Sequence, residues 1–149
     1  MTTSIPVYDP MSAYNSAINK LEKNGIRATK QRRVLAKLIF EKGKRHISAE
    51  NLFDEVKKEE RKISMATVYN TLKQFTSLGL IREIVVDQNK SLYCNNNQSH
   101  YHLYIEDEGK VIDIPTKNID LNIPSIPACL QLHNIDVIVR IRTLKDNKS

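Results

Sequence analysis

Residues 48–80 read SAENLFDEVKKEERKISMATVYNTLKQFTSLGL, and the spacing of their apolar residues decides the fold class of the first half of the chain. The first part predicts a helix that begins after Ser48, with an apolar face made of Ala49, Leu52, Phe53 and Val56. The second part predicts a helix that opens at Ser64, with an apolar stripe made of Met65, Val68, Leu72 and Phe75. Gly79 then stops this helix and an apolar strand follows. This order of elements predicts a winged helix-turn-helix.

The outer face of the second helix is small, polar and cationic, which suits a DNA major groove. It is formed by Ala66, Asn70, Lys73 and Ser77, with Thr67, Tyr69 and Gln74 beside them. In an isolated amphipathic helix such a face is more often just a solvated surface. The charge distribution favours DNA here. Residues 1–90 carry 17 Lys and Arg against 10 Asp and Glu, a net of +7, whereas residues 91–149 carry 6 against 7, a net of −1.

Two further helices are expected upstream. The first has an apolar stripe within residues 14–21 and stops at Asn24-Gly25. The second is capped by Thr29, and cations crowd its start, where phosphate oxygens could be met: Arg27, Lys30, Arg32 and Arg33. Such cations position a protein on DNA rather than specify bases.

Strands and loops fill the rest of the chain. Residues 81–86 and 91–94 predict a β-hairpin, the wing, and the polar run at 95–99 predicts a loop. We therefore expect a winged-helix DNA-binding domain at 1–94 and a second domain at 95–149, with strands at 101–105, 111–114 and 135–141. Pro115, Pro124 and Pro127 leave no room for a long helix between the last two strands. So small a unit buries little surface, so we expect it to dimerise.

Composition excludes several classes. No apolar run approaches about 18 residues and no signal pattern opens the chain, so we expect a cytoplasmic protein with no membrane partner. The two cysteines, Cys94 and Cys129, form no Cys-x-x-Cys pair. We therefore expect neither a structural zinc site nor a disulfide.

The histidines indicate a candidate sensing site. His100 and His102 lie two residues apart on a predicted strand, so both point to one face and can chelate a metal or bind haem. A lone pair of this kind is more often a surface feature, but its place between two domains favours a sensor. His46 and Cys94 are further candidate ligands. The alternatives are a solvent-exposed helix-entry residue for His46 and a small core residue for Cys94.

Five segments together resemble the ferric uptake regulator superfamily in order and spacing: GIRATKQR at 25–32, HISAE at 46–50, ATVYNTL at 66–72, GLI at 79–81 and HYH at 100–102. The resemblance covers nearly the whole chain. Within the superfamily, TVYN at 67–70, the cysteine-free stretch at 102–109, VIDIP at 111–115 and the Pro-rich segment before DVIVR at 136–140 are similar to the iron response regulator branch.

The resemblance implies an α+β fold and a homodimeric, DNA-binding transcriptional regulator of iron and haem homeostasis. It implies contacts to double-stranded promoter DNA by Arg27, Arg32, Ser64, Ala66, Thr67, Tyr69, Asn70 and Lys73. Within that set, Arg27 would approach a minor groove, Arg32 a phosphate, and Tyr69 and Asn70 bases. It implies a regulatory site made of His46, His100, His102 and, as an uncertain fourth ligand, Cys94.

The signal bound at this site would be haem, recruited by His100 and His102 and supplied by a haem-donor protein, or a divalent metal, Fe, Mn or Zn. The alternative function is an Fe(II)- or Mn(II)-activated repressor of metal-uptake genes. A different class is a metal-binding winged-helix module for protein contacts. The net charge of +7 on residues 1–90 argues against this class. No catalytic residues are expected, because no nucleophile motif, paired carboxylates or phosphate loop accompanies the site.

Overall fold

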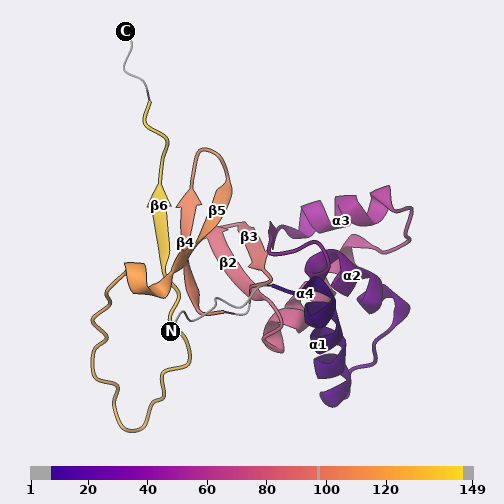
Figure 1. The fold of residues 1–149 in the computed structure, drawn as a ribbon, viewed down its shortest axis with the longest axis horizontal. Helices are drawn as coiled ribbons and strands as arrows, with labels where there is room; N and C mark the ends of the chain where they lie inside the picture. Colours follow the sequence, from indigo (N-terminus) through magenta and orange to yellow (C-terminus); the bar gives the residue numbers. More distant parts are fainter. Residues whose placement is uncertain (1–7, 97, 146–149) are drawn as a thin grey trace, which may run out of the picture. The chain divides into compact units, whose positions relative to one another are not determined.

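The structure is a computed structural model that describes residues 8–96 and 98–145, and the chain divides into two compact units, 1–97 and 98–149 (Figure 1). The first unit is the winged helix-turn-helix that the sequence predicts, and the second contains a three-stranded sheet. The division falls three residues after the Cys94–Asn95 boundary expected from sequence. The reason is Asn95, whose side chain bonds to the backbone of Ile39, Gly43 and Arg45 in the first unit.

Four helices build most of the first unit: α1 (Pro10–Lys23), α2 (Lys30–Phe40), α3 (Ala49–Lys58) and α4 (Met65–Ser77). Each begins after a side chain that accepts a backbone N–H of the first turn, namely Asp9, Thr29, Ser48 and Ser64. The predicted caps at Thr29 and Ser48 are confirmed. Gly79 follows α4 with a φ of 72°, a left-handed conformation that glycine adopts without strain, so the predicted stop is also confirmed.

The helices bury the apolar stripes that the sequence predicts. Leu52 and Val56 of α3 and Val68, Leu72 and Phe75 of α4 are fully buried. They join side chains of α1 and α2 in one hydrophobic core. The opposite face of α4 therefore remains at the surface.

A small antiparallel sheet completes the first unit. Its strands are β1 (His46–Ile47), β2 (Arg82–Asp87) and β3 (Lys90–Cys94), in the order β1-β3-β2. β2 and β3 form the predicted wing. β1 was not expected, because two residues are too few for a period to show.

The second unit contains β4 (His100–Ile105), β5 (Lys110–Pro115), the short 3-10 helix η1 (Thr116–Asn118) and β6 (Ile138–Ile141), and the sheet order is β5-β4-β6. β4 is antiparallel to β5 and parallel to β6. The three predicted strands are confirmed, although β6 begins three residues later than expected. Residues 119–137 contain no helix, as the prolines predict.

Few side chains of the second unit are buried. Among its described residues the buried ones are Tyr104, Val111, His100 and His102, whereas these large apolar side chains are exposed: Ile112, Leu121, Ile123, Ile126, Leu130, Leu132, Ile141 and Leu144. Such exposure agrees with a unit that needs a partner surface. In the described part of the chain, no helix is both long and apolar enough to cross a membrane.

Candidate nucleic-acid interface and metal centre

The exposed face of α4 carries the residues predicted to contact DNA. Ala66, Tyr69, Asn70 and Lys73 are exposed, and Thr67 is half-buried. At the start of the helix Ser64 Oγ accepts the backbone N–H of Thr67 at 3.1 Å and lies 2.9 Å from its hydroxyl. The helix N-terminus and these polar groups are therefore presented to the surface.

The first turn of α2 lies beside this face. Arg32 donates from Nε to Oε1 of Gln74 on α4 at 3.0 Å and from a terminal nitrogen to the backbone oxygen of Arg27 at 2.7 Å. A groove of about 430 Å³ lies between the two helices, lined by Thr29, Lys30, Gln31, Arg32, Thr67, Asn70, Thr71 and Gln74. Cationic and polar groups from two helices thus share one surface, as a DNA-binding domain requires.

Tyr69 is held by an acidic partner that sequence reasoning missed. Its hydroxyl donates to Oε1 of Glu50 at 2.5 Å. This hydrogen bond lowers the pKa of Glu50 and raises the pKa of Tyr69. Glu50 lies within the quoted HISAE motif, but no sequence pattern pairs it with a residue 19 positions away.

The first unit brings two candidate metal ligands together. In the sheet register His46 of β1 pairs with Cys94 of β3, and a ring nitrogen of His46 lies within 4.8 Å of the Cys94 sulfur. Cys94 is buried, and its sulfur accepts the backbone N–H of Asn96 at 3.5 Å. An N–H donor of this kind stabilises a thiolate, the form in which cysteine binds metals.

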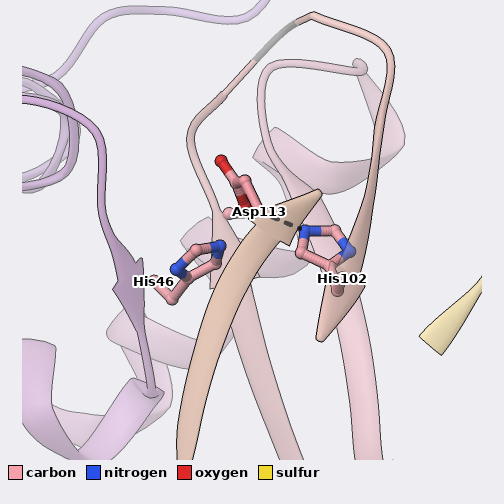
Figure 2. A group of neighbouring side chains, drawn as sticks. His46, His102 and Asp113 are labelled. Carbon is pink, nitrogen blue, oxygen red and sulfur yellow. Dashed lines mark ion pairs between the residues drawn. The ribbon is translucent and has the colours of Figure 1, made fainter. Parts of the chain in front are cut away.

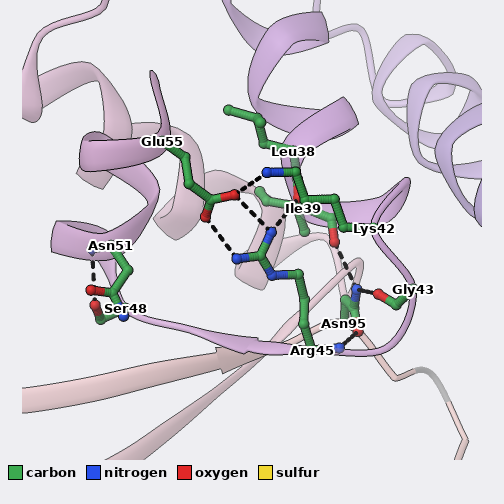
Figure 3. Close-up of polar contacts among 9 residues, drawn as sticks. All are labelled: Leu38, Ile39, Lys42, Gly43, Arg45, Ser48, Asn51, Glu55 and Asn95. Carbon is green, nitrogen blue, oxygen red and sulfur yellow. Dashed lines mark hydrogen bonds and ion pairs between the residues drawn. The ribbon is translucent and has the colours of Figure 1, made fainter. Parts of the chain in front are cut away.

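A buried polar network fixes the segment before His46 (Figure 3). Asn95 Oδ1 accepts the backbone N–H of Arg45 at 2.8 Å, and Asn95 Nδ2 donates to the carbonyls of Ile39 and Gly43 at 2.7 and 2.8 Å. The Arg45 guanidinium bonds both carboxylate oxygens of Glu55 on α3. The residues on either side of the His46 and Cys94 pair are thereby tied to α2 and α3.

Three donor atoms converge in the second unit. Nε2 of His100 lies 2.9 Å from Nε2 of His102, and Oδ1 of Asp113 lies 3.3 Å from the first and 3.5 Å from the second. Figure 2 shows His102 on β4 and Asp113 on the neighbouring strand β5, joined by their ion pair. Donors about 2.1 Å from a common ion have mutual separations of this size.

The histidine tautomer also fits a metal ligand. Nδ1 of His100 lies 2.5 Å from the carbonyl oxygen of Gln98, and because a carbonyl only accepts, Nδ1–H is the donor. In the neutral ring Nε2 then carries the lone pair that binds a metal, and the second nitrogen has the outer partner that metal-binding histidines usually have. The predicted placement of both histidines on one strand face is found, because both rings are buried.

Asp113 is the ligand candidate that sequence reasoning missed. It pairs directly with His102 in the antiparallel register. The signal was available, because a hairpin centred on the turn at 107–108 places residue 113 opposite residue 102. The sequence alone places the turn within 106–110 only to within one residue. A shift of the strand register by one residue would move Asp113 to the other face of the sheet.

The geometry gives no support to haem. A haem ligand presents Nε2 to the open face of a macrocycle, whereas both Nε2 atoms here face each other and Asp113 at 2.9–3.5 Å. Both rings are also at most 5% exposed. The predicted role of His100 and His102 in haem binding therefore stays an expectation from resemblance.

A family model described as the ferric uptake regulator family matches residues 23–141. The chain belongs to the ferric uptake regulator family. Proteins of this family are metal-responsive, DNA-binding transcriptional regulators rather than enzymes. The assignment to the iron response regulator branch, in contrast, stays a prediction.

Known members of the family are similar to this chain in sequence and, for the solved structures, in fold. The peroxide-responsive repressor PerR of Staphylococcus saprophyticus is 29% identical over 104 residues, 70% of each chain. The ferric uptake regulator of Vibrio cholerae has a TM-score of 0.66 and 25% identity, covering 85% of this chain and 98% of that one. A zinc-bound manganese uptake regulator has a TM-score of 0.58 and 27% identity, covering 86% and 98%.

Proposed function

We propose that this chain is a metal-activated transcriptional repressor that binds promoter DNA as a homodimer and holds one divalent ion at its regulatory site. The observation that carries the proposal is the convergence of His100, His102 and Asp113 at 2.9–3.5 Å on one face of a hairpin. A second donor pair, His46 and Cys94, meets in the first unit. Family membership supports the regulatory role, and the relatives' names include repressors that respond to peroxide and regulators of metal uptake.

The donor set supports a particular class of metal. Imidazole suits Fe(II) and Zn(II), thiolate is a soft ligand, and Mn(II) prefers carboxylate and water. Because two of the three donors in the second unit are imidazoles, the proposed site favours Zn(II) or Fe(II) over Mn(II). The haem-responsive alternative rests on resemblance to the iron response regulator branch alone.

The DNA-binding surface in this proposal is the exposed face of α4 with the first turn of α2. Tyr69 and Asn70 would contact base edges, and Arg27 and Arg32 would contact the backbone or a minor groove. The two recognition helices of a dimer must meet half-sites about 34–36 Å apart, so a change in the dimer on metal binding would change how well both half-sites are met. Metal occupancy would thereby change operator affinity.

The test is a titration of the metal-stripped protein onto promoter fragments of metal-uptake genes, with Zn(II), Fe(II) or Mn(II) added in turn. We expect Zn(II) or Fe(II) to raise affinity about 5- to 150-fold, the usual range of allosteric coupling. His102→Ala should lose this increase, and His133→Ala, which replaces an exposed histidine of the same unit, should keep it. Binding should weaken steeply with salt.

Two results would contradict the proposal. Salt-insensitive or absent DNA binding by the metal-loaded wild type would favour a protein-interaction module. DNA affinity that no divalent metal changes would remove the regulatory role of the site.

A further inference from the structure

The pairing of Tyr69 with Glu50 determines which hydrogen-bonding group the tyrosine presents. Tyr69 is 44% exposed on the face of α4 that carries the other predicted DNA contacts. Its hydroxyl donates to Glu50 Oε1 at 2.5 Å. A phenol has a single O–H, so once that proton is committed to Glu50 the oxygen can offer only its lone pairs to another group.

Glu50 is itself kept in its charged form. It lies in the first turn of α3, where the helix dipole favours a negative charge. The hydrogen bond from Tyr69 and, to a smaller extent, the Glu50 backbone keep the pKa of Glu50 below its ordinary value, although burial acts in the opposite direction. The acceptor therefore stays ionised at neutral pH.

We infer that Glu50 is a specificity-determining positioning residue, which fixes the Tyr69 hydroxyl as a hydrogen-bond acceptor toward DNA. The inference rests on the proposed DNA-binding role of α4. In the major groove only adenine N6 and cytosine N4 present donors, whereas guanine O6 and N7 and thymine O4 present acceptors. Tyr69 therefore selects an amino group at the base pair it reaches and disfavours acceptor edges and phosphate oxygens.

A purely electrostatic role for Glu50 makes a different prediction. A carboxylate near DNA repels the phosphates of every sequence alike, so its removal would raise affinity without changing sequence preference. If Glu50 positions Tyr69, its removal must change the sequence preference at one base pair. The two roles are separated by measuring specificity together with affinity.

The experiment selects binding sites for the metal-loaded wild-type protein from a pool of random DNA duplexes and then replaces bases of the selected site with analogues. Purine in place of adenine, or pyrimidin-2-one in place of cytosine, deletes the amino group. At one pair per half-site we expect wild-type affinity to fall about 5- to 100-fold, the range for a base-specific contact. Tyr69→Phe and Glu50→Ala should bind the natural and analogue sites equally at that pair.

Two further variants complete the design. Glu50→Gln keeps an amide oxygen that accepts the phenol proton, so it should retain discrimination that Glu50→Ala loses. Asp54→Ala removes an exposed acid from the same helix and should leave discrimination unchanged. Three results would overturn the inference. Glu50→Ala could discriminate the natural from the analogue site as well as the wild type does, or Glu50→Gln could lose this discrimination as fully as Glu50→Ala. The third is a wild type whose affinity depends on no amino group of the selected site. Failure of the wild type to select any sequence would instead overturn the proposed function.

Discussion

At the scale of single residues, the first unit depends on one buried amide. Asn95 is 2% exposed, and its side chain bonds the backbone of Ile39 in the last turn of α2 and of Gly43 and Arg45 in the segment that links α2 to β1. It follows Cys94 directly and contacts the residue before His46. One side chain therefore fixes the ends of both strands that carry candidate ligands.

We predict that Asn95→Ala destabilises the protein by about 3 kcal/mol, because it leaves buried backbone donors and acceptors unpaired at about 1–3 kcal/mol each. Urea unfolding at neutral pH measures this loss. Asn19→Ala, at an exposed position of α1, is the matched control and should change stability by less than about 0.5 kcal/mol. Equal effects of the two substitutions would show that the network around Asn95 contributes little.

At the scale of elements, most of the fold could be predicted from the sequence, because its signals are local. The helices have strong apolar stripes and side-chain caps, and the wing has a turn between two apolar runs. β1 is too short to carry a period. The proposed roles of Asp113 and Glu50 depend on partners 11 and 19 residues away. The first follows from the hairpin register only once the turn is placed to the residue, and the second depends on helix packing, which no local pattern encodes.

An ion-pair network joins α3 to the segment before β1. Glu55 of α3 contacts both Arg45 and Lys42. Burial raises the pKa of Glu55, but the hydrogen bonds and charges of Arg45 and Lys42 outweigh this effect, so its pKa lies below its ordinary value. The folded state therefore holds this carboxylate ionised at pH values where the unfolded chain already binds a proton.

We predict that this network stabilises the protein above the unfolded pKa of a glutamate, about 4.3, and that the contribution is lost as pH falls through the lower folded pKa. Because the groups are partly exposed, the size should be about 1 kcal/mol or less. Urea unfolding between pH 7 and pH 3 should show a smaller loss of stability for Glu55→Gln than for the wild type. Glu59→Gln, at the exposed C-cap of the same helix, should follow the wild type, and a wild-type slope in Glu55→Gln would contradict the prediction.

At the scale of the whole molecule, the two units have different proposed tasks. The first carries the positive charge and the recognition helix, and the second exposes apolar side chains suited to a second copy of the chain. Each unit holds only part of the proposed ligand set: His46 and Cys94 in the first, and His100, His102 and Asp113 in the second. The proposed regulation requires that the chain bind one divalent ion with His100, His102 and Asp113.

Cobalt(II) titration of the metal-stripped protein measures this binding directly, because the visible absorption of bound Co(II) depends on its ligands. We expect one Co(II) per chain, with affinity lowered more than about tenfold in both His102→Ala and Asp113→Asn, since even the loss of a residue that only supports a metal ligand costs about 10- to 100-fold. His133→Ala should bind as the wild type does. No tight Co(II) binding by the wild type, or an affinity that both His102→Ala and Asp113→Asn leave unchanged, would contradict the proposed site.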